Sequence, residues 1–245
     1  ELVLANGKRE FYTPKMARRL GLASHHERCH TCPEKDKCSF FLDITADRNF
    51  KELYFDNEKY DGYYRDRCVW RPDISIEDTM NVIVKYKTGA TLSYSLNAMN
   101  AWEGYTIAFN GTKGRLEHSI VEGGATSAGA TNYQQDKDRE TIRVIPLRGK
   151  AQDIEVWTGT GGHGGGDNVM LTEVFGKAEE DKYTRAADER SGLYSILIGA
   201  AANRCFETGA QVRIADLVNG LSSPVVAPMP TRDDPVPMPI GDRFI

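Results

Sequence analysis

Features that would point to a membrane or a nucleic acid are missing from this 245-residue sequence. Its longest strongly apolar run, LYSILIGAAA at 193–202, is too short to span a bilayer. No signal peptide is visible. The 35 acidic residues outnumber the 31 basic ones, so no broad basic face is available to bind nucleic acid. We therefore expect neither kind of partner.

An initiator methionine is also absent, because the chain opens at Glu1. We expect the sequence to be a piece of a longer protein. This leaves the compartment open: a reducing cytoplasm is favoured, and export to an oxidising compartment is the alternative.

Strand-like segments cluster in the middle of the chain and do not alternate with helices. A first strand is expected within 1–12, and six more follow from residue 79, two of them forming a hairpin around Lys87-Thr-Gly89-Ala. Two helices follow the glycine run, with Asp167 and Asp188 as expected N-caps. The pattern predicts an α+β fold: a large, predominantly antiparallel sheet with helices packed on one face.

The chain is expected to form a single domain over 1–245, with two unusual segments. Residues 24–72 are polar and turn-rich and hold four of the five cysteines. The tail at 222–245 holds six of the ten prolines, and it is expected to follow the surface. The intervening segment 123–139 lacks any hydrophobic period and is expected to be a loop.

The cysteines are spaced as a possible metal site. Cys29, Cys32 and Cys38 follow the pattern C-x2-C-x5-C, and Cys68 comes 30 residues later. Three thiolates on a tight turn and a distant fourth suit a tetrahedral zinc ion, which we favour. Two disulfides, an iron–sulfur cluster and free thiols are the alternatives. Cys205 lies in an apolar segment and is expected to be a buried core thiol.

A glycine run surrounds one histidine in VWTGTGGHGGGDNVML, residues 156–171. The window 159–164 satisfies G-x-G-x-x-G, but no convincing strand follows the next helix, so a dinucleotide-binding motif is not favoured. The glycines instead leave the backbone around His163 open to a bulky ligand. An imidazole there can exchange hydrogen bonds with a substrate hydroxyl. A glycine linker with an incidental histidine is the alternative.

Several stretches together resemble the C-terminal half of the Gfo/Idh/MocA oxidoreductases. They are EDTMNVIVKYKTGATLSYSLNA, then EGYTIAFNGTKGRLEHS, then GGHGGGD and the closing SGLYSILIGAAANRCFETGAQVRI. The cysteine segment CHTCPEKDKC is similar to an insertion in one bacterial branch of the family. The resemblance covers about residues 1–221.

The resemblance implies a parent enzyme that moves a hydride between NAD(P) and a sugar or polyol carbon. The family's Rossmann domain, its Lys-Pro motif and its Asp and His pair do not appear in this sequence, so NAD(P) would be bound by a part that this chain lacks. The chain would be the substrate-binding and oligomerisation half, forming a dimer or tetramer through a sheet face. An NAD-dependent glycosidase of the same family, a non-catalytic sugar-binding module and a zinc-only interaction domain are the alternatives.

The resemblance also suggests residues that contact the sugar. We expect His163 and Asp167 in the glycine loop to contribute, together with Arg71. Asn97, Trp102 and Tyr105 are candidates for polar contact and ring stacking, with ordinary packing as the alternative. Arg71 could instead pair with Asp73. No catalytic residue is assigned within this chain.

Overall fold

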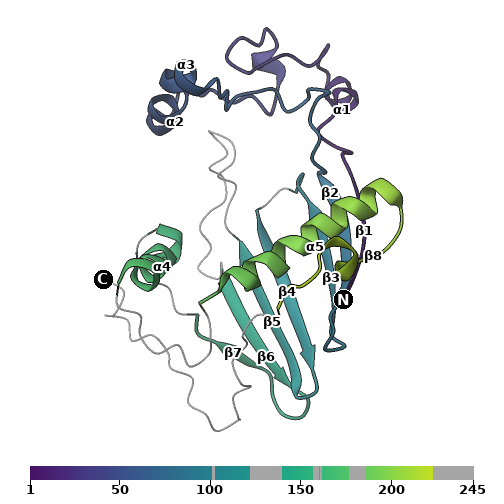
Figure 1. Ribbon diagram of the computed structural model, residues 1–245. Coiled ribbons are helices and arrows are strands. Elements are labelled where there is room, and N and C mark those ends of the chain that lie inside the picture. Colours follow the sequence, from purple (N-terminus) through teal and green to yellow (C-terminus); the bar gives the residue numbers. More distant parts are fainter. Residues whose placement is uncertain (101–102, 122–139, 157–159, 161, 177–185, 223–245) are drawn as a thin grey trace. The chain divides into compact units, whose positions relative to one another are not determined.

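The computed structural model describes residues 1–100, 103–121, 140–156, 160, 162–176 and 186–222 (Figure 1). The chain divides into two compact units. One unit contains residues 1–4 and 84–91 and the described part of 155–245. The other unit contains residues 5–83 and the described part of 92–154.

One four-stranded sheet has the strand order β3-β2-β1-β8. Its strands are β1 (Leu2–Lys8), β2 (Thr79–Lys85), β3 (Thr91–Asn97) and β8 (Val212–Arg213). Val3 and Ala5 in β1, and Val82 and Val84 in β2, are buried at every second position, as a sheet with one covered face requires. The predicted turn between β2 and β3 is confirmed, since the amide of Tyr86 donates to the carbonyl of Ala90 at 2.9 Å.

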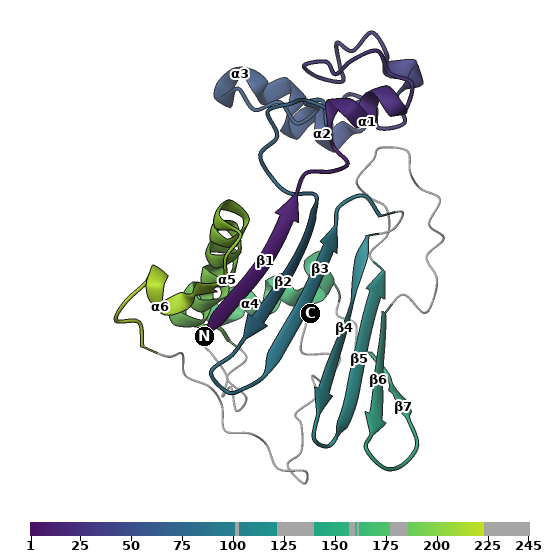
Figure 2. The ribbon, with the colours of Figure 1, turned by 90° about the vertical axis from the view of Figure 1, so that its right-hand side faces the viewer.

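A second four-stranded sheet follows the chain order β4-β5-β6-β7 and is antiparallel throughout (Figure 2). Its strands are β4 (Gly104–Gly111), β5 (Gly114–Val121), β6 (Glu140–Pro146) and β7 (Gln152–Ile154). Gly114 has a φ of 150°, and a Cβ at that position would overlap the carbonyl of Ile145. The turn between β4 and β5 therefore requires glycine at this point.

The longest helix, α5 (Glu189–Thr208), packs near β1 and β8. The predicted N-cap is confirmed: the Asp188 carboxylate accepts the amide of Ser191 at 2.8 Å. The helix ends at Gly209, and the short α6 (Ile214–Leu217) follows β8. Cys205 is a buried thiol, as expected, and its Sγ lies 3.5 Å from the carbonyl oxygen of Val3.

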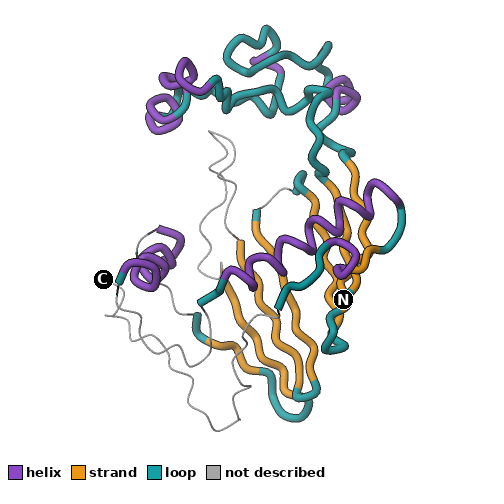
Figure 3. The backbone as a smooth tube through the Cα atoms, viewed as in Figure 1, coloured by secondary structure: helices purple, strands orange, loops and turns teal. Residues whose placement is uncertain are grey.

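The segment between β1 and β2 contains short helices joined by loops (Figure 3). These are α1 (Pro14–Arg19), α2 (Arg48–Leu53) and α3 (Glu58–Asp61), with single 3-10 turns η1 (Lys35–Lys37) and η2 (Phe55–Asn57). Its core is an aromatic cluster around Trp70. The ring of Trp70 contacts those of Phe11, Tyr12 and Phe40, at centroid distances of 4.9 to 5.9 Å. Ala17, Leu22 and Cys68 are buried around this cluster.

The predicted α+β class and the antiparallel pairing are confirmed, but the strands form two sheets where one large sheet was expected. The short helices α1, α2 and α3 were not predicted, although Thr13 as N-cap and Pro14 as first residue are typical of a helix start. The predicted loop at 123–139 and nearly all of the predicted tail lie outside the described residues. Among the described helices, none is long and apolar enough to cross a bilayer.

Candidate functional site

His163 and Asp167 form a side-chain pair at the start of α4 (Gly166–Phe175). His163 Nδ1 lies 2.8 Å from Oδ1 and 3.0 Å from Oδ2 of Asp167. The imidazole is 87% exposed and the carboxylate 46% exposed, so solvent reaches both groups. A proton on Nδ1 is donated to the carboxylate in this geometry, which leaves Nε2 free to accept a hydrogen bond from a ligand.

The glycine run supplies the backbone shape that this pair needs. The 3-10 turn η3 (Gly162–Gly165) leads directly into α4. His163 has a φ of 50° and Gly165 a φ of 90°, both in the left-handed region. Gly165 is the N-cap of α4, and no side chain caps the helix. The expectation that Asp167 is the N-cap is therefore wrong: Asp167 lies in the first turn and binds His163.

The G-x-G-x-x-G window does not build a dinucleotide site in the described residues. Such a site needs a strand, a helix and a second, parallel strand. Between α4 and β8 the described residues contain only α5, and β8 pairs with β1 in the antiparallel sense. In the residues that the structure describes, this window therefore lacks the surroundings of a dinucleotide-binding motif.

Asn97 and Tyr105 are both exposed in the unit that contains residues 5–83. Asn97 is the last residue of β3. Tyr105, 48% exposed on β4, contacts the ring of His118 with a centroid distance of 5.3 Å, and His118 Nε2 lies 3.0 Å from the carboxylate of Glu140. Trp102, the third predicted sugar contact, lies outside the described residues.

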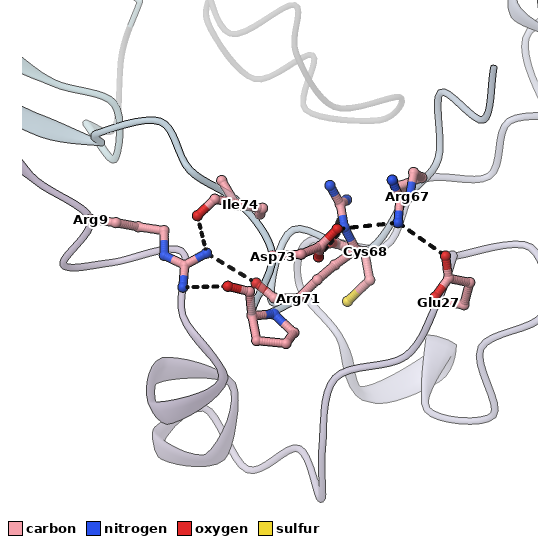
Figure 4. A network of polar contacts seen from close by, with 8 residues as sticks. Arg9, Glu27, Arg67, Cys68, Arg71, Asp73 and Ile74 are labelled. Atoms are coloured by element: carbon pink, nitrogen blue, oxygen red, sulfur yellow. Dashed lines mark hydrogen bonds and ion pairs between the residues drawn. The ribbon is translucent and has the colours of Figure 1, made fainter. Parts of the chain in front are cut away.

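Arg71 is engaged in a polar network near the cysteines (Figure 4). Its Nε donates to Asp73 at 2.9 Å and its Nη1 donates to the carbonyl of Cys68 at 3.1 Å. Arg9 in turn donates to the carbonyl oxygens of Arg71 and Ile74 at 3.2 and 2.6 Å. Arg71 thus pairs with Asp73 and also donates to the backbone at Cys68, and its role in sugar binding stays a prediction.

The four cysteines of the predicted metal site line one pocket. The pocket walls also include His26, Glu34 and the aromatic rings of Phe40, Phe41 and Trp70. His30, which lies between two of the cysteines in sequence, is not part of this lining and stacks on Phe55 with a centroid distance of 4.8 Å.

Burial raises the pKa of two of these thiols. The pKa of Cys29 is raised to about 11: burial is the main cause, negative charge on Asp66, Cys68 and Cys38 adds to it, and a hydrogen bond from the backbone of Leu42 opposes it. Burial also raises the pKa of Cys32, against a hydrogen bond from the amide of Glu34. A nearby cation would favour the thiolates.

A buried ion-pair network supports this pocket, and the sequence reasoning missed it. The Asp66 side chain is fully buried, and its Oδ1 lies 2.8 Å from Nη2 of Arg28. Arg28 also donates to both carboxylate oxygens of Glu58, at 2.9 and 2.6 Å, which holds its pKa above the usual value. His30 donates its backbone amide to Asp66 at 2.8 Å. The fragment RDRC around Asp66 was the one signal in the sequence, and its pattern is unspecific.

Within the part of the chain that the structure describes, no three His, Cys, Asp or Glu side chains are gathered closely enough to hold a metal ion as they stand. All five cysteines are free thiols. The arrangement of the side chains therefore does not by itself support the zinc site predicted from the spacing, and zinc stays a prediction.

Comparison with known families decides the identity of the fold. Residues 43–214, well over half of the chain, match the model of the Gfo/Idh/MocA oxidoreductase family, C-terminal alpha/beta domain. The chain belongs to this family. The resemblance inferred from the sequence motifs is thereby confirmed. The cysteine turn at 29–38 precedes the matched residues, whereas Cys68 lies inside them.

One relative of this family domain is the protein named “Putative oxidoreductase YteT” from Bacillus subtilis (strain 168), which is 35% identical over 179 residues. That match covers 70% of this chain and 40% of YteT, so the matched part spans less than half the length of this relative. A solved structure from Desulfitobacterium hafniense DCB-2, described as a “putative nadph-dependent oxidoreductase”, aligns with a TM-score of 0.40 at 14% identity. The alignment covers 60% of this chain and 40% of the chain of the solved structure.

Proposed function

We propose that this chain is the substrate-binding and oligomerisation part of an NAD(P)-dependent oxidoreductase that acts on a sugar or polyol. Membership of the oxidoreductase family carries the proposal. Because the glycine run lacks the strand–helix–strand surroundings of a dinucleotide-binding motif in the described residues, NAD(P) would be held by another part of the parent protein, where it would accept the hydride. The residues of this chain would bind and orient the substrate.

His163 is the residue we assign to the substrate. Asp167 holds Nδ1, and the imidazole is otherwise open to solvent. With Nδ1 protonated, Nε2 accepts a hydrogen bond from a substrate hydroxyl, and it can receive that proton if the hydroxyl carbon is oxidised. The left-handed backbone at Gly165 places this imidazole on the turn before α4. Asn97, Tyr105 and Trp102 remain proposed contacts to the sugar.

Exposed apolar side chains on β4 favour an oligomer. Tyr105, Ile107 and Phe109 alternate along the strand, so they share one face, and they are 48%, 38% and 58% exposed. A second copy of the chain would cover Ile107 and Phe109, and Tyr105 stays a proposed contact to the sugar. Light scattering of the full-length protein tests this: a dimer or tetramer is expected, and a monomer at all concentrations would contradict it.

A second function within the same family is cleavage of a glycosidic bond through a transient NAD redox step. The His163–Asp167 pair is compatible with both reactions, because each begins by removing a hydroxyl proton. They differ in net products. The oxidoreductase accumulates NAD(P)H in step with the oxidised sugar, whereas the glycosidase releases a free sugar and returns its cofactor to the starting state.

Titration with NADH, followed by the fluorescence of NADH, tests whether the cofactor is bound outside this chain. The full-length protein and this 245-residue chain are compared side by side, after each has been shown to unfold cooperatively. Binding is expected only for the full-length protein. Tight binding of NADH by this chain alone would overturn the proposal, and a full-length protein that binds no NAD(P) would favour a non-catalytic sugar-binding module.

A further inference from the structure

The four clustered cysteines come from two segments that lie far apart in sequence. Cys29, Cys32 and Cys38 belong to the loop around η1, and Cys68 precedes Trp70 in the buried core. All four line the same pocket, which Cys205 does not. The fold of this segment therefore brings four cysteines from two distant parts of the sequence to one pocket.

Backbone hydrogen bonds fix the two segments to each other. The amide of Cys29 donates to the carbonyl of Asp66 at 2.8 Å, and the amide of Cys68 donates to the carbonyl of Glu27 at 3.1 Å. Arg28 and Arg67 form an antiparallel bridge between them. Cys29 and Cys68 each follow a residue of this bridge, so the backbone holds these two positions next to each other.

The local backbone around the first two thiols is shaped like a metal-binding turn. The amide of Cys32 donates to the carbonyl of Cys29 at 3.0 Å, which closes the C-x2-C turn. Two thiols on one closed turn form the usual first half of a zinc site with four cysteines.

We propose that this pocket binds one Zn²⁺ through the thiolates of Cys29, Cys32, Cys38 and Cys68, independently of the proposed redox function. The four side chains are not close enough to hold an ion as they stand, so binding would require rotation of the cysteine side chains toward the ion. Four thiolates on two tethered segments match the closed tetrahedral form of structural zinc. The ion would join the η1 loop to the core at Trp70, in a segment whose helices are at most six residues long.

His26 is the other pocket residue with a nitrogen that could bind zinc, and it serves as the matched control. Its Nε2 lies 3.0 Å from Oε2 of Glu34, whose carboxylate also accepts the amide of Ala23 at 2.9 Å. The histidine is thus already paired within the pocket wall, and we do not include it among the ligands.

The test is the metal content of the full-length protein, expressed with zinc and iron both supplied. Elemental analysis is expected to find about one zinc per chain, as for a single site of four thiolates. After removal of zinc with a chelator under reducing conditions, titration with Co²⁺ is expected to produce thiolate-to-cobalt charge transfer and the visible bands of a tetrahedral site. Cys38→Ser and Cys32→Ser are expected to lose the bound zinc, whereas Cys205→Ala and His26→Gln retain it.

Each other outcome contradicts the proposal. Wild-type protein that carries no zinc and gives no cobalt bands would overturn it without any variant, so the test stands even if the serine variants fail to fold. A protein that contains iron and acid-labile sulfide would have an iron–sulfur cluster in this pocket in place of zinc. Loss of zinc in His26→Gln with retention in Cys38→Ser would show a different ligand set.

Discussion

The cysteine pocket and the glycine–histidine loop are built in opposite ways. The pocket is held by contacts between residues far apart in sequence, such as the ion pair between Arg28 and the fully buried Asp66. The loop depends on one pair, His163 with Asp167, only four residues apart and largely exposed. Its backbone shape comes from its own glycines.

This difference separates a site that supports the fold from one that is free to meet a ligand. A buried network resists change, because removal of one partner leaves the other desolvated and unpaired. An exposed local pair contributes little to stability, but its free ring nitrogen remains available. Substitutions in the pocket should therefore reduce stability, and substitutions in the loop should reduce activity.

The largest expected effect on stability is that of Asp66→Asn. It leaves Arg28 buried without one of its two carboxylates, and we expect a loss of about 3 kcal/mol of unfolding free energy. Urea denaturation measures the loss as a lower transition midpoint. The matched control is Glu52→Gln, which breaks an exposed ion pair with Arg48 and should change the free energy by at most about 0.5 kcal/mol. Equal effects of the two substitutions would remove the contrast between the regions.

A smaller loss is expected from Asp78→Asn, and it should depend on pH. Burial alone would raise the pKa of Asp78, but its carboxylate accepts the amides of Glu10, Tyr12 and Phe11 at 2.8 to 2.9 Å, and the net effect lowers the pKa below 3.8. A lowered pKa in the folded state means that the carboxylate stabilises the fold fully above pH 3.8 and loses this contribution as the pH falls through the lowered value.

The cost of Asp78→Asn at neutral pH should be about 2 kcal/mol, since hydrogen bonds to a charged acceptor are lost. Urea midpoints measured from pH 7 downward should fall less steeply below pH 3.8 for this variant than for wild type. Parallel curves would show that Asp78 does not contribute to the pH dependence.

The smallest expected effect is that of Asp167→Asn in the full-length protein, where it tests the proposed role of His163. The side-chain amide of this variant can still accept a hydrogen bond from Nδ1 of His163, but it lacks the negative charge of the carboxylate. We therefore expect kcat/KM to fall about tenfold, which is equivalent to about 1.4 kcal/mol. The midpoint of urea denaturation should be unchanged within about 0.5 kcal/mol, because the pair is exposed. A large loss of stability would place Asp167 among the residues that support the fold.

Local patterns in the sequence predicted the strands and the start of α5 well. The turn at Lys87-Thr-Gly89-Ala indicated the hairpin of β2 and β3, and Asp188 indicated the start of α5, because each signal acts within a few residues. The division into two sheets was not predictable, because it depends on which strands pair. Such pairs can join residues that are far apart in sequence, as Val3 and Val212 show. The short helices α2 and α3 lack a long apolar period, so no periodic signal could reveal them.

The candidate site was predicted in its residue types and only partly in its contacts. The glycines around His163 indicated an open loop, but the contact with Asp167 replaced the expected helix cap because Gly165 already begins α4. The cysteine spacing indicated that the thiols meet, and they do line one pocket. The pairing of Asp66 with Arg28 was missed, because the fragment RDRC is too unspecific a pattern to indicate that a charged residue is buried.

The most direct test of the proposed substrate role is the kinetics of His163→Asn in the full-length protein, with NAD(P)H formation followed over a panel of sugars and polyols. Asparagine tolerates the left-handed backbone at this position but lacks the imidazole. For a sugar or polyol that the wild type oxidises, kcat/KM is expected to fall about 100-fold, with NADH binding and the urea midpoint unchanged. An unchanged kcat/KM, or activity that is independent of any sugar or polyol, would contradict the account.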